Sequence, residues 1–120
     1  MAKEDTFRRF VGLDGRYEEL MAAALRDRVV DGPELVQVGR ADLIRVLEKY
    51  LDGEIGGEQL VDWAELIHGL DEVQVESGSE SEDLILEFLF EASTPEIFEP
   101  ISCEFALRWL GLLGGGRTSM

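Results

Sequence analysis

The feature that most constrains the fold of this chain is a pair of helical patterns joined by a short polar turn. In residues 41–51, apolar side chains recur at the three- and four-residue spacing of one helix face, and a second such pattern runs from about 58 to 70. Asp52-Gly53 lies between them and is suited to end the first helix, because glycine readily takes the left-handed conformation that follows a helix. The connection is short, so we expect an antiparallel helical hairpin at about 41–70.

Similar patterns predict further helices on both sides of the hairpin. The expected segments are a short helix over 5–11, a longer one over 16–30, an apolar helix that follows Ser81, and a last helix over 103–113 after the capping residue Ser102. The helix after Ser81 is apolar on most of its circumference, which is typical of a central position. Trp63 and Trp109 lie on apolar helical faces, so we expect both in the core.

The remaining segments read as connections. Residues 34–38 fit either a short strand or an extended connector, residues 71–80 a loop whose flexible part is Ser77-Gly78-Ser79, and residues 95–98 a short turn or helix. No internal repeat is visible. We therefore predict an all-α fold, a compact bundle of four to five main helices, with a single domain over 1–113 and a flexible glycine-rich tail over 114–120.

The charges are distributed very unevenly along the chain. The net charge is −15; residues 1–50 are nearly balanced, whereas Leu51 to Leu107 contain sixteen Asp and Glu and no Lys or Arg. Such a charge argues against direct binding to nucleic acid or to an anionic membrane surface. No apolar run approaches the roughly 20 residues that span a bilayer, the start of the chain has no signal-like apolar region, and Cys103 is the single cysteine. We expect a cytoplasmic protein.

Within the acidic stretch, the carboxylates form two rows at helical spacing. The candidate partner-binding face consists of Glu58, Asp62 and Glu65 on one helix and Asp83, Glu87 and Glu91 on the next. Like charges four residues apart destabilise a helix by roughly 0.2–0.5 kcal/mol per pair, yet no lysine interrupts either row. The rows are interpreted in two ways, as a solvated face that keeps the protein soluble or as a surface shaped by a basic partner.

Residue types that carry catalysis or bind metals are scarce. His68 is the single histidine, and Cys103 lies far from it in sequence. The segment around Asp52-Gly53 has the glycine of an EF-hand loop, but Tyr50 and Gln59 stand where that loop needs oxygen ligands and a bidentate glutamate. No cysteine–histidine cluster suits zinc, and no phosphate-binding glycine motif is present. We therefore predict that the protein is not an enzyme and has no catalytic residues, no cofactor and no metal site.

The hairpin sequence is similar to a known group of proteins. Tyr50-Leu51-Asp52-Gly53-Glu54-Ile55, followed by Leu60 and Trp63-Ala64, resembles small acidic bacterial toxin-immunity proteins of the colicin D immunity type. The resemblance covers residues 41–70 and carries over no binding residue. It implies a short, acidic, helical, cytoplasmic protein that binds and blocks a basic nuclease toxin.

Three hypotheses of function follow from these observations. The first is a non-catalytic acidic protein-binding module, a cognate inhibitor that blocks a basic protein in the manner of an immunity protein or antitoxin. The second is an acidic mimic of nucleic acid that binds many nucleic-acid-binding proteins. The third is a structural or adaptor module whose charge serves solubility. It would be a homodimer if Leu86, Leu107 and Leu112 exceed what one copy can bury.

Overall fold

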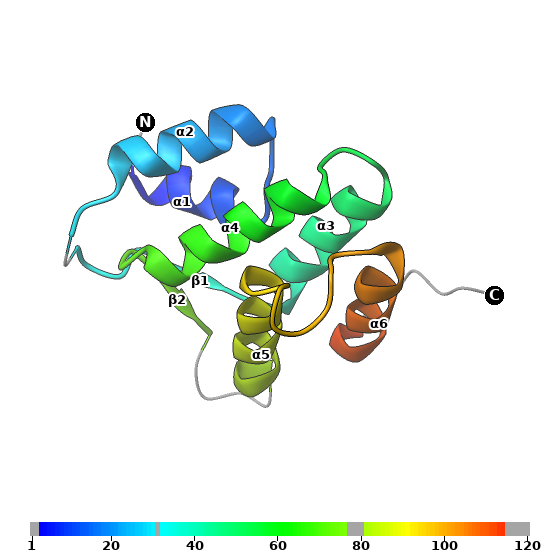
Figure 1. The fold of residues 1–120 in the computed structure, drawn as a ribbon. Helices are drawn as coiled ribbons and strands as arrows, with labels where there is room; N and C mark the ends of the chain where they lie inside the picture. Colours follow the sequence, from blue (N-terminus) through cyan, green and yellow to red (C-terminus); the bar gives the residue numbers. More distant parts are fainter. Residues whose placement is uncertain (1–2, 31, 77–80, 115–120) are drawn as a thin grey trace.

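Helices dominate the structure, a computed structural model that describes residues 3–30, 32–76 and 81–114 (Figure 1). In the described residues the elements, in chain order, are α1 (Lys3–Val11), α2 (Tyr17–Asp27), β1 (Val36–Val38), α3 (Arg40–Leu51), α4 (Gly57–Gly69), β2 (Val73–Val75), α5 (Ser81–Ser93) and α6 (Cys103–Leu113). The mostly helical fold expected from the sequence is therefore present, with α1 as a sixth helix. The predicted flexible segment 77–79 and all but the first residue of the predicted tail lie outside the described residues.

A small parallel sheet corrects the all-helical prediction. β1 pairs with β2 in the register Val36 to Val73, Gln37 to Gln74 and Val38 to Val75. Residues 34–38 thus contain a strand rather than only a connector, and the segment 71–80, predicted as a loop, contains its partner. Val36, Val38 and Val73 are buried whereas both glutamines are exposed, so the pair is held by the two-residue alternation of side chains against the core.

From β1 onward, the element order strand–helix–helix occurs twice. β1, α3 and α4 form the first unit, and β2, α5 and α6 form the second. Each unit opens with Val-Gln-Val and carries a tryptophan in its second helix, Trp63 in α4 and Trp109 in α6. The structure thus shows a repeated arrangement where the sequence analysis found none, because the matching residues are few and their spacing differs between the units.

The helix ends agree with the capping residues in the sequence. The Ser102 hydroxyl accepts a hydrogen bond of 3.1 Å from the Phe105 amide at the start of α6. After α3, Gly53 adopts a φ of +82°, as expected for the turn that leads to α4. α3 and α4 touch, but α4 packs mainly on α5 and α3 mainly on α6 (Figure 1). The contact between α3 and α4 is therefore less extensive than the contact that each of them makes with α6 or α5.

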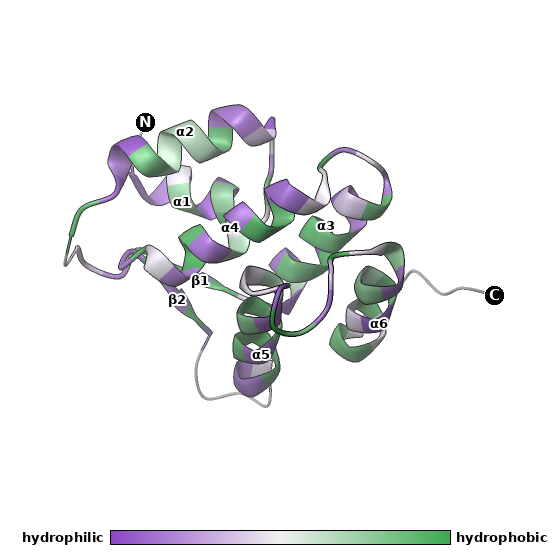
Figure 2. Cartoon of the chain, viewed as in Figure 1, coloured by the Kyte–Doolittle hydropathy of each residue, from purple (hydrophilic) through white to green (hydrophobic). Residues whose placement is uncertain are grey.

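The core is a single cluster of buried apolar side chains that all six helices and both strands of the described part contribute to. Its centre is aromatic: the Phe88 ring lies 5.3 Å from Trp109, 6.0 Å from Phe105 and 6.5 Å from Trp63, between ring centroids. Both tryptophans are buried, as expected. Figure 2 shows that hydrophobic residues make up much of α5 and α6, and four of them, Leu86, Phe90, Leu107 and Leu112, are exposed.

Two expectations about burial differ from the structure. α2 ends at Asp27, and Leu25, placed on its core stripe by the sequence pattern, is 48% exposed. The helix after Ser81 was expected to be central, and α5 does bury Ile85, Phe88 and Leu89, but Leu86 and Phe90 are exposed on its other side. α5 therefore covers the core with one face and leaves a second apolar face open.

Candidate protein-binding surface

The first acidic row lies on the outer face of α4. Glu58, Asp62 and Glu65 are all exposed, and none makes an ion pair with a described residue. Their position follows from the helical period, because Leu60, Trp63 and Ala64 occupy the buried side of the same helix. Three unpaired carboxylates within two helical turns give this face a negative potential.

Part of this row borders an open groove between α2 and α4. Tyr17, Met21 and Leu25 of α2 form one side, while Asp62, Glu65 and Leu66 of α4 form the other, around a volume of about 450 Å³. The groove combines an apolar floor with an acidic edge. Local sequence patterns could not predict this arrangement, because α2 and α4 are separated in the chain by β1 and α3 and the helical spacing of Leu25 indicates a core position.

Tyr17 lines this groove, and its hydrogen bond and pKa reflect the surroundings there. Its hydroxyl donates a hydrogen bond of 3.1 Å to the backbone carbonyl of Gln59. Burial raises the pKa of Tyr17 to about 12, and the negative charges of Asp62 and Glu18 contribute to the increase. Both effects disfavour the phenolate, so the groove presents a neutral tyrosine beside charged carboxylates.

In the second acidic row, on α5, two carboxylates are unpaired in the part of the chain that the structure describes, and the third forms an ion pair with an arginine. Asp83 and Glu87 are exposed and have no ion pair among the described residues. Glu91 is instead largely covered, and Arg108 of α6 lies 3.3 Å from it while also pairing with Glu99. The structure thus leaves five of the six predicted carboxylates available to a partner and places the sixth in an internal ion pair.

Exposed apolar side chains lie next to this row. Leu86 and Phe90 follow Asp83 at the spacing of one helix face, and the Phe90 ring packs edge-on against Phe98 with centroids 5.2 Å apart. Ile97, Phe90 and Phe98 are 67%, 51% and 46% exposed. We call Leu86, Phe90, Ile97 and Phe98 the aromatic patch. In the sequence, the feature that indicates this patch is the alternation of acidic and apolar residues at positions 83, 86, 87 and 90, which share one helix face.

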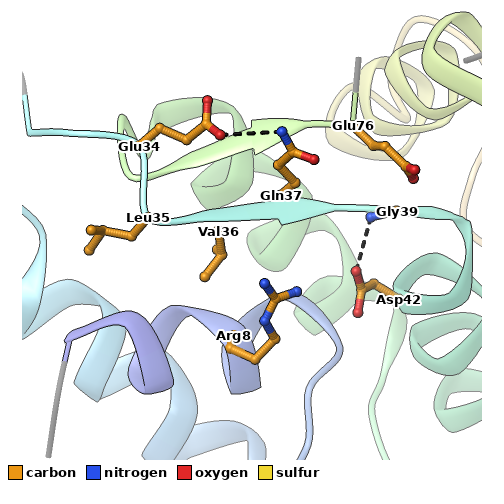
Figure 3. Close-up of a pocket in the computed structure, with 8 residues that line it drawn as sticks. All are labelled: Arg8, Glu34, Leu35, Val36, Gln37, Gly39, Asp42 and Glu76. Atoms are coloured by element: carbon orange, nitrogen blue, oxygen red, sulfur yellow. Dashed lines mark hydrogen bonds between the residues drawn. The ribbon is translucent and has the colours of Figure 1, made fainter. Parts of the chain in front are cut away.

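A polar depression lies at the start of α3, beside β1 (Figure 3). Two of its three carboxylates make local hydrogen bonds: Asp42 accepts one of 2.9 Å from the Gly39 amide and one of 2.8 Å from Arg45, and Glu34 accepts one from Gln37. Arg8 enters from α1. Because Asp42 holds the turn into α3, we assign this residue a structural role.

Of the residues weighed for chemistry, His68 lines a small pocket together with Leu86 of the aromatic patch. His68 is exposed in the last turn of α4, and Cys103 is exposed at the first position of α6. Cys103 lies near Tyr50, whose pKa is raised by burial and, to a smaller extent, by that thiol. Within the described ranges, no group of three or more His, Cys, Asp and Glu side chains could hold a metal ion. No helix there is long and apolar enough to cross a membrane.

Comparison with known proteins identifies no relative of the chain. No family model, no characterised protein and no solved structure matches the chain. The function is therefore argued from the surfaces described above.

Proposed function

We propose that this protein is a non-catalytic, acidic protein-binding module of the cytoplasm that inhibits a basic partner, as a toxin-immunity protein does. One observation carries the proposal: exposed carboxylates without ion pairs occur beside exposed apolar side chains, on α4 next to Leu25 and on α5 next to Phe90. Carboxylates kept only for solubility do not need apolar neighbours, whereas protein interfaces combine an apolar centre with a polar rim.

The charge pattern favours a basic partner in particular. From Leu51 to Leu107 no Lys or Arg is present. Two arginines from other parts of the chain that reach α4 and α5 already have partners: Arg28 donates to the Gly69 carbonyl at the end of α4, and Arg108 pairs with Glu91 and Glu99. Electrostatic attraction of this kind accelerates association and makes it sensitive to salt.

Affinity capture from the native host tests this proposal. The tagged protein is exposed to host lysate at low salt, and bound proteins are eluted at about 0.5 M salt, where the Debye length falls to roughly 4 Å. We expect one predominant basic protein whose activity is inhibited by the purified chain. A matched variant with Asp62, Asp83 and Glu87 reversed to lysine should not retain it. Binding that ignores both salt and this charge reversal would contradict the proposal.

A structural or adaptor role through self-association is the second candidate. It is favoured by Leu86, Leu107 and Leu112, which are all exposed. Sedimentation at several protein concentrations separates the two candidates, because only self-association makes the apparent mass depend on concentration.

A further inference from the structure

We infer that the aromatic patch on α5, with the carboxylates of Asp83, Glu87 and Glu96 around it, is the docking surface for the basic partner. The occupant is a basic protein surface that presents an aliphatic or aromatic side chain flanked by Arg or Lys. The inference rests on the proposed function and deepens it, because it assigns the interface to α5 and the segment 94–100 rather than to the groove between α2 and α4.

The apolar part of the surface has the composition of an interface centre. Phe90, Ile97 and Phe98 each expose about half or more of their area, although burying an aromatic side chain is among the largest gains available to a folding chain. Aromatic side chains are enriched at the positions that dominate binding energy. The groove between α2 and α4 offers one comparably exposed apolar side chain, Leu25, beside partly buried Tyr17 and Met21.

Internal contacts hold the patch in one arrangement before any partner arrives. Arg108 bridges Glu91 on α5 to Glu99 in the following segment. The Thr94 hydroxyl donates a 2.7 Å hydrogen bond to the carbonyl of Phe90, and the amides of Ile97 and Phe98 donate to the Thr94 carbonyl. These bonds fix Phe98 against Phe90, so a partner binds without having to order this segment, which favours affinity.

The charges around the patch decide between a basic partner and a second copy of this chain. Asp83, Glu87 and Glu96 are exposed and make no ion pair with a described residue. In a two-fold dimer the same surface faces itself, so the three carboxylates of one copy would face a surface of the same negative charge, which opposes association. A basic surface gains attraction from the same three groups, which makes it the occupant that the patch fits.

A cationic amphipathic helical peptide of leucine and arginine, labelled with fluorescein, serves as the probe. Its affinity for the full chain is measured by fluorescence anisotropy at low salt. The test variants are F90S and D83N/E87Q. The comparison variants at the competing groove are L25S and D62N/E65Q, which remove a similarly exposed apolar side chain and the same charge there. I97S is added because Ile97 is the most exposed member of the patch and its replacement leaves the core intact. Circular dichroism confirms that each variant is folded.

We expect F90S to weaken binding by about tenfold or more, as for a dominant interface residue, and by more than L25S or D62N/E65Q does. D83N/E87Q should weaken binding and reduce its dependence on salt. Larger losses in L25S and D62N/E65Q would overturn the assignment to α5 and leave the proposed function standing. Binding that is absent at low salt, or that no variant and no salt concentration changes, would overturn both. Dimerisation of the free chain that F90S abolishes would show that a second copy occupies the patch.

Discussion

The indole N–H of Trp63 donates a hydrogen bond of 3.1 Å to the backbone carbonyl oxygen of Phe10 and so ties α4 to α1 inside the core. Trp109 occupies the corresponding helix of the second strand–helix–helix unit and is equally buried, but its indole nitrogen has no hydrogen-bond partner among the described residues. The two tryptophans therefore bury similar surface while differing in one polar contact.

This difference predicts unequal costs for the same substitution. Trp63→Phe removes this hydrogen bond, although the Phe10 carbonyl still accepts one of 3.1 Å from the Leu13 amide. The variant should therefore lower the free energy of unfolding by about 0.5–1.5 kcal/mol beyond the loss of ring volume. Trp109→Phe loses similar volume but also removes an unpaired polar group, so its total cost should be smaller. Urea unfolding of both variants measures the two costs, and equal values would show that the Trp63 hydrogen bond adds nothing.

Local patterns predicted the parts of the fold that depend on neighbours in sequence. The stripe containing Leu43 and Leu47 located α3, and Ser102 located the start of α6, because helical spacing and capping involve residues three or four apart. The pairing of β1 with β2 could not be predicted in this way. Each strand has only three residues and is stabilised by pairing with a strand 37 positions away in the chain. A local sequence pattern contains no information about such a distant partner.

The candidate surface was predictable to the same extent. Helical spacing placed Glu58, Asp62, Asp83 and Glu87 on exposed faces, as the structure shows. It could not show that Arg108 would reach Glu91, since these residues meet only through the packing of α5 beside α6. The sequence pattern also predicted too much burial for α5. A fully buried helix and a helix with one exposed apolar face can have the same composition, so composition does not distinguish them.

Tyr17 should make the protein lose stability at alkaline pH. Its pKa is about 12 in the folded state, raised by burial and by Asp62 and Glu18, whereas an unfolded tyrosine titrates near 10. Between these values the unfolded chain releases the proton and the folded chain keeps it, so the free energy of unfolding falls as pH rises from about 10 to 12. Ultraviolet absorbance of the phenolate during titration measures the pKa.

Tyr17→Phe is the matched control for this pH dependence. It removes the titrating group and the hydrogen bond to Gln59, so the variant should be less stable at neutral pH by about 1 kcal/mol. Its stability should also decline less steeply than that of the wild type above pH 10. Parallel declines in both proteins would assign the alkaline effect to other groups.

Two exposed glycines should respond to alanine in opposite directions. Gly53 has a φ of +82° and Gly111 lies inside α6, and a methyl group at either position would meet no atom within 4 Å. Only backbone conformation therefore separates them. Gly53→Ala should destabilise the protein by roughly 1 kcal/mol, and Gly111→Ala should stabilise it by roughly 0.5–1 kcal/mol. Thermal unfolding of the two variants tests the signs, and a shared sign would contradict the argument.

Arg108 should contribute more to stability than a typical surface arginine. It pairs with Glu91 and Glu99, and its guanidinium lies 5.8 Å from the ring centroids of both Phe105 and Trp109. Arg108→Met should lower the free energy of unfolding by about 1 kcal/mol, because a network that joins separate segments exceeds a single exposed pair.

Arg26→Met is the comparison for Arg108. Among the residues that the structure describes, Arg26 pairs only with its neighbour Asp27, and its side chain is 71% exposed. Chemical denaturation of the two variants should give the smaller change for Arg26→Met. If both substitutions had the same effect, the bridge between α5 and the segment that follows it would have no stabilising role, and the argument that the aromatic patch is held in place would lose its main support.

Glu87→Gln should separate the function of the acidic row from its structural cost. Glu87 has Asp83 and Glu91 as like-charged neighbours four residues away on α5, and each such pair destabilises a helix by roughly 0.2–0.5 kcal/mol. Arg108 already offsets the charge of Glu91, so the repulsion between Glu87 and Glu91 is weakened. Neutralising Glu87 should therefore stabilise the protein by a few tenths of a kcal/mol in total. The same change should weaken binding of the leucine–arginine peptide at low salt. A variant that is more stable and binds less well would mean that the row is retained for its partner; a variant that binds equally well would mean that the charge serves solubility alone.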